Sequence, residues 1–278
     1  DEDDAGEGNV PITLKDPKQV RSDSLQSPHD PDVTYSGHKG KGYEVQVAET
    51  CDEENVTQIL THVDTTPSCG SDAEVTVPVI DALGEREIQP GELFADTTFG
   101  SGRNAIEAER RGTELVSPVA GPGAGRTEEA VHGADTRLTT ADFQIDASAE
   151  KPSVCPSGRE AFDEYEECEA SERVELRFAR ATCEACPLRL RCPVELSCKL
   201  GAYVLEADLI KVNIERRRRA EASGEFRLRY AIRAGIEGTN SELKRAHGLG
   251  RLRVRGGPRV RLAVYLKALA CNLKRMVQ

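Results

Sequence analysis

The stretch of residues 91–121 constrains the fold most strongly, because its elements alternate in the order typical of an α/β domain. A short apolar run, Leu93–Ala95, ends at Asp96 and is followed by a loop of small residues. Residues 103–111 then show a helical pattern, and a second apolar run covers residues 114–119. Strand, loop, helix and strand of this length predict a βαβ unit with a parallel strand pair. Asp96 would lie at the carboxyl end of the first strand, where α/β folds commonly place their chemistry.

Other segments add elements on both sides of this unit. Residues 42–50 alternate apolar and polar side chains, which predicts a strand with one buried face. Residues 56–66 are rich in β-branched side chains and predict a neighbouring strand. We expect helices in three further segments, which lie within residues 71–87 around Pro78, over residues 227–244 and over residues 259–276.

Charge is distributed unevenly along the 278 residues, which carry a net charge of −11. From Lys211 to Gln278 there are 18 basic and 5 acidic residues, so this part carries +13 and residues 1–210 carry −24. A basic C-terminal part of this size predicts a surface for a polyanion such as DNA. The alternative is a pair of exposed basic helices that the acidic remainder of the chain neutralises.

The N-terminal part gives little indication of packing. Residues 1–40 are rich in Asp, Ser, Pro and Gly, so we expect a linker or a disordered tail there. The chain has neither a run of about 18 apolar residues nor a basic-then-apolar start, so we expect neither a membrane anchor nor Sec-type export. The only methionine is Met276, which suggests a fragment or a trimmed product.

Nine cysteines are present, and most of them lie within residues 126–200. The core motif is CEACPLRLRC, which contains Cys183, Cys186 and Cys192. Thiolates at this spacing can share one tetrahedral cation. The fourth ligand must come from elsewhere in the segment, in order of preference from Cys155, Cys168 or Cys198. A structural zinc ion is the favoured occupant, and the alternatives are an iron–sulfur cluster or unmetallated thiols in a reduced cytosol.

A second group of polar residues lies in the basic part of the chain. The residues are offset by 0, 3, 7 and 14 positions, which places them within an arc of about 60° on one helix; they are Tyr230, Arg233, Glu237 and Lys244. The alternative is an ordinary ion pair between Arg233 and Glu237, which are four residues apart. Further on, residues 251–261 alternate arginine with apolar side chains, which predicts a strand or turn with a basic outer face.

The spacing Tyr-x2-Arg-x3-Glu-x6-Lys is also the signature of insertion-sequence transposases of the DDE type, and the chain resembles this family over residues 27–278. The segments that are similar to one subgroup are SPHDPDVTYSGHKGKGYEVQVAET, FADTTFGS, CEACPLRLRC and GLGRLRVRGGPRVRLAVYLKALACNLKRM. The resemblance implies DNA transposition by metal-dependent strand cleavage and transfer. The implied partner is double-stranded DNA, both at the transposon ends and at the target site. The resemblance also implies that the full-length protein is a homo-oligomer, and that it lies in the bacterial cytoplasm in association with the nucleoid.

The resemblance also implies a division of the chain. Its fold class would be α/β, an RNase H-like DDE catalytic domain with a cysteine-rich insertion. Residues 1–40 would be the acidic linker, and residues 41–125 the first part of the core. Residues 126–200 would be the insertion with the predicted zinc site. Residues 201–278 would be the second part of the core, with the basic helices.

Individual residues acquire expected roles from the same resemblance. Asp96 would be the second catalytic aspartate and Glu237 the catalytic glutamate. Together they would hold Mg²⁺ or Mn²⁺, which prefer carboxylate oxygens. Two such ions can activate an attacking oxygen and stabilise the leaving one. The residues expected to contact DNA are Tyr230, Arg233, Lys244, Arg245, Arg251, Arg253 and Arg255.

Two features depart from the family pattern. Phe99 stands where a tyrosine is common, and the strand that carries the family's first catalytic aspartate has no counterpart, since Asp30 and Asp32 match a later segment. We therefore expect a domain that is incomplete at its N-terminus, a central sheet that folds poorly, and a chain that is inactive alone. The alternatives are a catalytically dead, zinc-stapled DNA-binding remnant or regulator of transposition, and a relic without a role.

Overall fold

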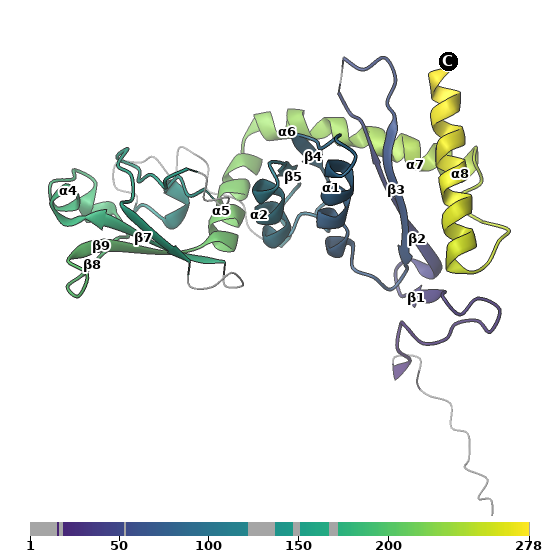
Figure 1. Cartoon of the computed structure of the whole chain (residues 1–278), viewed down its shortest axis with the longest axis horizontal. Helices are drawn as coiled ribbons and strands as arrows, with labels where there is room; N and C mark the ends of the chain where they lie inside the picture. The colour runs from purple at the N-terminus through teal and green to yellow at the C-terminus, as the bar shows by residue number, and fades with distance from the viewer. Residues whose placement is uncertain are drawn as a thin grey trace, which may run out of the picture.

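The computed structural model describes residues 16, 19–52, 54–121, 137–146, 151–166 and 172–277. Cys168, the expected linker up to residue 15 and the start of the expected insertion, residues 126–136, lie outside the described residues. The arrangement is elongated, with a four-stranded sheet at one end and helix α8 (Gly257–Met276) at the other (Figure 1).

An antiparallel sheet in the order β1-β2-β3 lies next to α8. Its strands are β1 (Thr34–Ser36), β2 (Gly40–Glu49) and β3 (Leu60–Pro67), so both strands expected here are confirmed. The structured region begins earlier than the sequence predicted. Asp30 is buried and accepts a hydrogen bond of 2.6 Å from Tyr43 Oη. Asp32 accepts a bond of 2.8 Å from the backbone N–H of Gly257, at the start of α8. The expectation of a linker is therefore wrong for this part of residues 1–40.

The predicted βαβ unit is confirmed. It consists of β4 (Glu92–Phe94), α2 (Gly102–Arg110) and β5 (Glu114–Val116), and the two strands are parallel. Helix α1 (Thr76–Gly84) packs beside α2 over a small apolar core. Pro78 lies in the first turn of α1, where the missing N–H leaves no helical bond unmade.

A four-stranded antiparallel sheet, in the order β6-β7-β9-β8, forms the other end of the molecule. Its strands are β6 (Asp163–Glu166), β7 (Arg173–Ala179), β8 (Glu195–Ser197) and β9 (Ala202–Asp208). The sheet continues to Asp208, past the expected end of the insertion at residue 200, because β9 pairs along the whole of β7. Its apolar face is buried around Phe143, Leu176 and Phe178.

Helix α5 (Leu209–Glu221) connects this sheet to the βαβ unit (Figure 1). Its arginines contribute to the positive charge from which the sequence predicted a DNA surface. Arg216 donates to the carbonyl of Phe143. Arg217 donates to the carbonyls of Gly100 and Ser117, at 2.9 and 2.7 Å. Burial lowers the pKa of both guanidinium groups. These arginines hold α5 to its neighbours and are not available to DNA.

The C-terminal part differs from the single helix expected over residues 227–244. It consists of α6 (Gly224–Tyr230), a 3₁₀ turn (Ala231–Ala234) and α7 (Gly235–Arg245). The segment before α8, where the sequence predicted a strand or turn, is a loop that runs into α8. None of the helices in the described part of the chain combines the length and apolarity that crossing a membrane requires.

Polar side chains fix α8 to α7 and β3. Asn272 bonds to both backbone groups of Leu60, accepting from the N–H at 2.9 Å and donating to the carbonyl at 3.0 Å. Glu242 on α7 pairs with Lys274 at 2.7 Å and with Arg275 at 3.1 Å. Arg275 also pairs with Glu49 of β2 at 3.1 Å. The hydrogen bond from Lys274 is the largest of the effects that together lower the pKa of Glu242 to about 2.

We expect Glu242→Gln to lower the free energy of unfolding at pH 7 by about 1–2 kcal/mol, because Lys274 and Arg275 lose their carboxylate partner. The pKa of Glu242 falls on folding, so its contribution is complete above the usual value of 4.5 and disappears as the pH falls through about 2. The difference from wild type in urea denaturation should therefore shrink over that range. Glu85→Gln, at an exposed position, is the control. A difference that stays constant down to pH 2 would contradict the assignment.

Candidate active site

Asp96 lies at the turn that follows β4. The backbone N–H of Ala95 donates to the carbonyl of Val116 at 3.0 Å, which extends the parallel pairing up to this point. Asp96 Oδ1 accepts a bond of 2.8 Å from the N–H of Thr97, and its carbonyl accepts one of 3.0 Å from the N–H of Phe99. The Asp96 side chain is half exposed. The turn therefore presents the carboxylate to solvent, with Oδ1 held by the turn and Oδ2 pointing outside it.

The loop after Asp96 is held by its surroundings. The carbonyl of Phe99 accepts hydrogen bonds from Thr76 Oγ1 at 3.0 Å and from Asn104 Nδ2 at 2.7 Å. A Cβ atom on Gly100 would lie 1.5 Å from Ser117 Oγ, so only glycine fits there. This packing fixes the course of the loop that follows Asp96.

Two neighbouring residues anchor α6 to β4. Arg229 pairs with Glu92 at 2.7 Å and with Glu114 at 2.6 Å, at the start of β4 and β5. Tyr230 Oη donates a hydrogen bond of 3.0 Å to the carbonyl of Ala95, at the end of β4. The last residue of α6 thus lies beside the turn that carries Asp96.

One guanidinium group brings the two predicted catalytic carboxylates together. Arg233 Nη2 lies 3.4 Å from Asp96 Oδ2, and Arg233 Nη1 lies 3.3 Å from Glu237 Oε1. The Arg233 side chain is only 24% exposed, whereas that of Glu237 is 71% exposed. Burial raises the pKa of Tyr230; Arg233 opposes this shift, and both carboxylates add to it. Asp96, Arg233 and Glu237 therefore lie close enough to the Tyr230 phenol to affect its ionisation.

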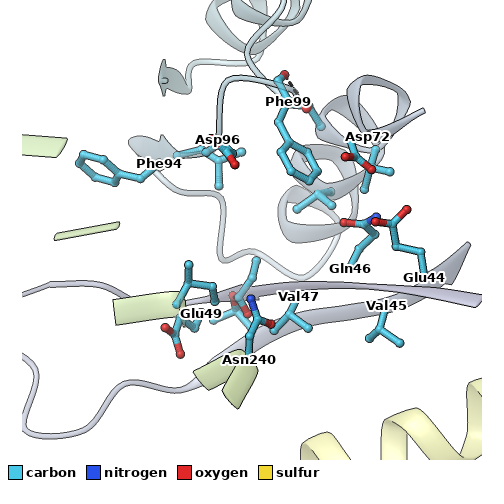
Figure 2. A pocket seen from close by; sticks show the side chains of 18 of the residues that line it. Glu44, Val45, Gln46, Val47, Glu49, Asp72, Phe94, Asp96, Phe99 and Asn240 are labelled. Carbon is cyan, nitrogen blue, oxygen red and sulfur yellow. Dashed lines mark hydrogen bonds between the residues drawn. The ribbon is translucent and has the colours of Figure 1, made fainter. Parts of the chain in front are cut away.

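The remaining predicted DNA contacts lie at the end of α7 and in the loop before α8. Lys244, at the end of α7, lines the same groove as Asp96 and Arg233. Asn240 and Glu49 also line this groove, across from Asp96 (Figure 2). The other four basic residues are exposed on the end of α7 and the loop before α8, and no ion pair with another described residue is recorded for them; they are Arg245, Arg251, Arg253 and Arg255. Tyr230, Arg233 and Glu237 converge although a 3₁₀ turn interrupts the predicted helix.

Sequence reasoning missed two contributors to this site. Arg229 anchors α6, but its partners Glu92 and Glu114 are distant in the chain, so no local pattern could identify them. Asn240 lines the groove from α7, four positions before Lys244, and helical spacing could have indicated it.

The residues around Asp96 provide some of the ligands that a divalent cation needs. Two exposed carboxylates that share one positive counter-ion offer the hard oxygen ligands that Mg²⁺ and Mn²⁺ prefer. Two carboxylates alone leave most positions of an octahedral ion to water or to other groups. Within the described ranges, only Glu242, His247 and Cys271 form a trio with ligand atoms all within 4.8 Å of each other. There Glu242 is already paired with Lys274 and Arg275.

Four cysteines line one small pocket beside the four-stranded sheet, namely Cys155, Cys183, Cys186 and Cys192. Burial, followed by the neighbouring thiols Cys192, Cys155 and Cys186, raises the pKa of Cys183 to about 11. Among the described cysteines, no three sulfur atoms lie within 4.8 Å of one another. Cys198 is exposed and does not line the pocket. The four thiols line the same pocket, but their sulfur atoms are not as close together as the ligands of one metal ion.

The structure is mixed α/β, and two carboxylates meet at the end of a strand. This arrangement is compatible with an RNase H-like fold. Residues 154–277, less than half of the chain, match the family model of the transposase DDE domain. The match supports a DDE transposase, and it includes Glu237 but begins after Asp96. No curated protein and no solved structure gave a significant match.

We expect Tyr230→Phe to destabilise the protein by about 1 kcal/mol, because the carbonyl of Ala95 loses its donor in a partly buried contact. Urea denaturation gives the difference. Tyr265→Phe, at a more exposed position of α8, removes the same hydroxyl group without a recorded bond and should change little. Equal effects of the two substitutions would show that the Tyr230 hydroxyl does not anchor α6.

Proposed function

We propose that this chain is part of a DDE transposase that cuts and joins DNA strands with divalent metal ions. The observation that carries the proposal is the convergence of Asp96 and Glu237, from distant parts of the chain, on the guanidinium of Arg233. Carboxylates repel each other, so a fold that collects them beside one cation favours a role in binding positive charge.

In this proposal Asp96 and Glu237 hold Mg²⁺ or Mn²⁺. Bound metal would activate the attacking oxygen of water or of a 3′-hydroxyl and stabilise the leaving oxygen. The chain's own residues would orient the DNA strand. Arg233 is bound to both carboxylates and could turn one N–H toward a phosphate oxygen. Tyr230 stacks on Phe226, with ring centroids 5.5 Å apart, which holds the phenol next to the carboxylates.

The DNA backbone would be held by basic side chains around the groove. Lys244 lines the groove itself, and the exposed arginines follow in the loop before α8, at positions 245, 251, 253 and 255. Contacts of this kind give affinity without sequence preference, and the affinity falls steeply with salt.

The site has two carboxylates where the resemblance implies three. We infer that the third is supplied by a polypeptide segment outside these 278 residues, and that the chain alone cleaves DNA poorly. The active form would be a homo-oligomer of the full-length protein, which acts at transposon ends and target DNA in the bacterial cytoplasm, associated with the nucleoid.

A second candidate function is a DNA-binding regulator of transposition without catalysis. Arg233 favours it, because a guanidinium between the two carboxylates offsets part of their negative charge without any metal. The two functions share the basic surface and differ in whether Asp96 and Glu237 bind a divalent ion.

We expect Glu237→Gln to weaken Mn²⁺ binding at least tenfold, measured by the relaxation of water protons, because half of the carboxylate pair is lost. Affinity for duplex DNA, measured by fluorescence anisotropy, should be retained. Glu225→Gln, at an exposed position of α6, makes the same change of charge outside the site. If both variants bind Mn²⁺ as the wild type does, the metal-dependent function is wrong and the DNA-binding regulator remains.

The cysteine pocket is proposed to hold a structural zinc ion through Cys155, Cys183, Cys186 and Cys192. Burial and then the neighbouring cysteines raise the pKa of Cys183, and a bound cation would favour its thiolate form. We expect cobalt(II), as a substitute for zinc, to give the visible absorption of a tetrahedral thiolate site. Cys192→Ser should weaken this spectrum, whereas Cys198→Ser should leave it unchanged. Identical spectra from both variants would exclude this ligand set.

A further inference from the structure

Three side chains with different metal-binding atoms meet where α7 packs against α8. Glu242 belongs to the last turn of α7, His247 to the turn of chain after it, and Cys271 to α8. One carboxylate oxygen, one imidazole nitrogen and the Cys271 sulfur all lie within 4.8 Å of one another. None of the three residues lines the groove beside Asp96 or the cysteine pocket, so the cluster is a separate feature of the molecule.

The backbone around His247 is fixed by both helices. The N–H of His247 donates to the carbonyl of Glu242 at 3.2 Å, and Lys267 of α8 donates to the carbonyl of His247. Gly248 has a φ of +63°, a left-handed conformation that favours glycine, and it turns the chain after α7. The His247 side chain is only 13% exposed, and it is therefore held beside the other two ligands.

The imidazole lacks the partner that its burial demands. His247 Nε2 is buried and has no hydrogen-bond partner within the described part of the chain. Glu242 Oε1 lies 3.8 Å from it, which is too far for a hydrogen bond. Cys271, the third member of the cluster, has no exposed surface. A buried polar atom without a partner is uncommon, and a bound ion is one of its ordinary explanations.

The three donor types favour a borderline-soft transition-metal ion. Thiolate and imidazole groups bind Zn²⁺ well, whereas Mg²⁺ and Ca²⁺ prefer sites made of oxygen atoms alone. Ligand atoms around a tetrahedral zinc ion lie roughly 3.3–3.8 Å apart, so small rotations of the side chains suffice to close this cluster. Three protein ligands leave the fourth position to water.

The ion pairs around Glu242 allow a divalent cation to enter. Lys274 occupies Oε1, the oxygen on the side of the imidazole, but its side chain is 45% exposed and can turn into solvent. Arg275 remains paired with Oε2 and with Glu49. Binding moves the thiol proton of Cys271 to solvent, and no electron is transferred. Among the charged groups that pair with the ligands, two carboxylates, one thiolate, one guanidinium and the divalent cation then balance.

We propose that Glu242, His247 and Cys271 bind a zinc ion that fastens the end of α7 to α8. The helix fixed in this way is the one that carries Glu237 and Lys244, so the ion restrains the wall of the groove without lining it. The inference rests on the cluster between the two helices and holds whether or not the chain cleaves DNA.

Zinc titration of the metal-free full chain tests the proposal. His247→Gln and Cys271→Ser should each bind one zinc equivalent fewer than the wild type, counted by competition with a coloured chelator at micromolar zinc. His38→Gln and Cys198→Ser, at exposed positions, are the matched controls and should retain the full number. Because every variant is compared with the wild type, the result does not depend on whether the cysteine pocket also binds zinc.

A second measurement needs no substitution. In nitrogen-15 NMR of the wild-type chain, zinc should move the Nε2 resonance of His247 to the position of a metal-bound nitrogen, while the resonances of His38 stay in place. The proposal is overturned if His247→Gln retains the full number of zinc ions, or if the His247 resonance does not move. Loss of zinc by Cys271→Ser without that movement would reflect misfolding of the variant and would overturn it as well. Equal losses in His247→Gln and His38→Gln would show adventitious binding only.

Discussion

The contact of Arg233 with Asp96 and Glu237 is the interaction on which the candidate site depends. Two carboxylates so close together repel each other unless a positive charge lies between them. Arg233 supplies that charge, and the fold supplies its position, because Tyr230 and Arg229 fix the preceding helix to the two ends of β4. The exposed surface of the two carboxylates leaves room for a metal ion or a phosphate to compete for the same charges.

Arginines also connect parts of the molecule that lie outside the proposed DNA-binding site. Those of α5 donate to carbonyl groups of the four-stranded sheet region on one side and of the βαβ unit on the other. They are half-buried, which lowers the pKa of both guanidinium groups, and the hydrogen bonds to carbonyl groups favour the charged form. Basic residues in this chain therefore divide into internal connectors and a smaller exposed set near the groove.

Local patterns predicted the parts of the fold that depend on local physics. Period-two alternation identified β2, and the order of strand, loop, helix and strand identified the parallel pair that positions Asp96. The charge total overestimated the basic surface that is available to DNA. A count of arginines does not distinguish those of α5, which are half-buried against carbonyl groups, from exposed ones such as Arg251. The 3₁₀ turn before Gly235 was missed since nothing in its composition interrupts the helical pattern. The pairing of Arg229 with Glu92 is a contact between distant segments, which no spacing rule contains.

Asn272 protects part of one edge of the three-stranded sheet. Its amide occupies the outward backbone groups of Leu60, so α8 blocks β3 at the point where another chain would begin to pair. Edge-to-edge pairing of a second copy with this part of β3 is therefore disfavoured.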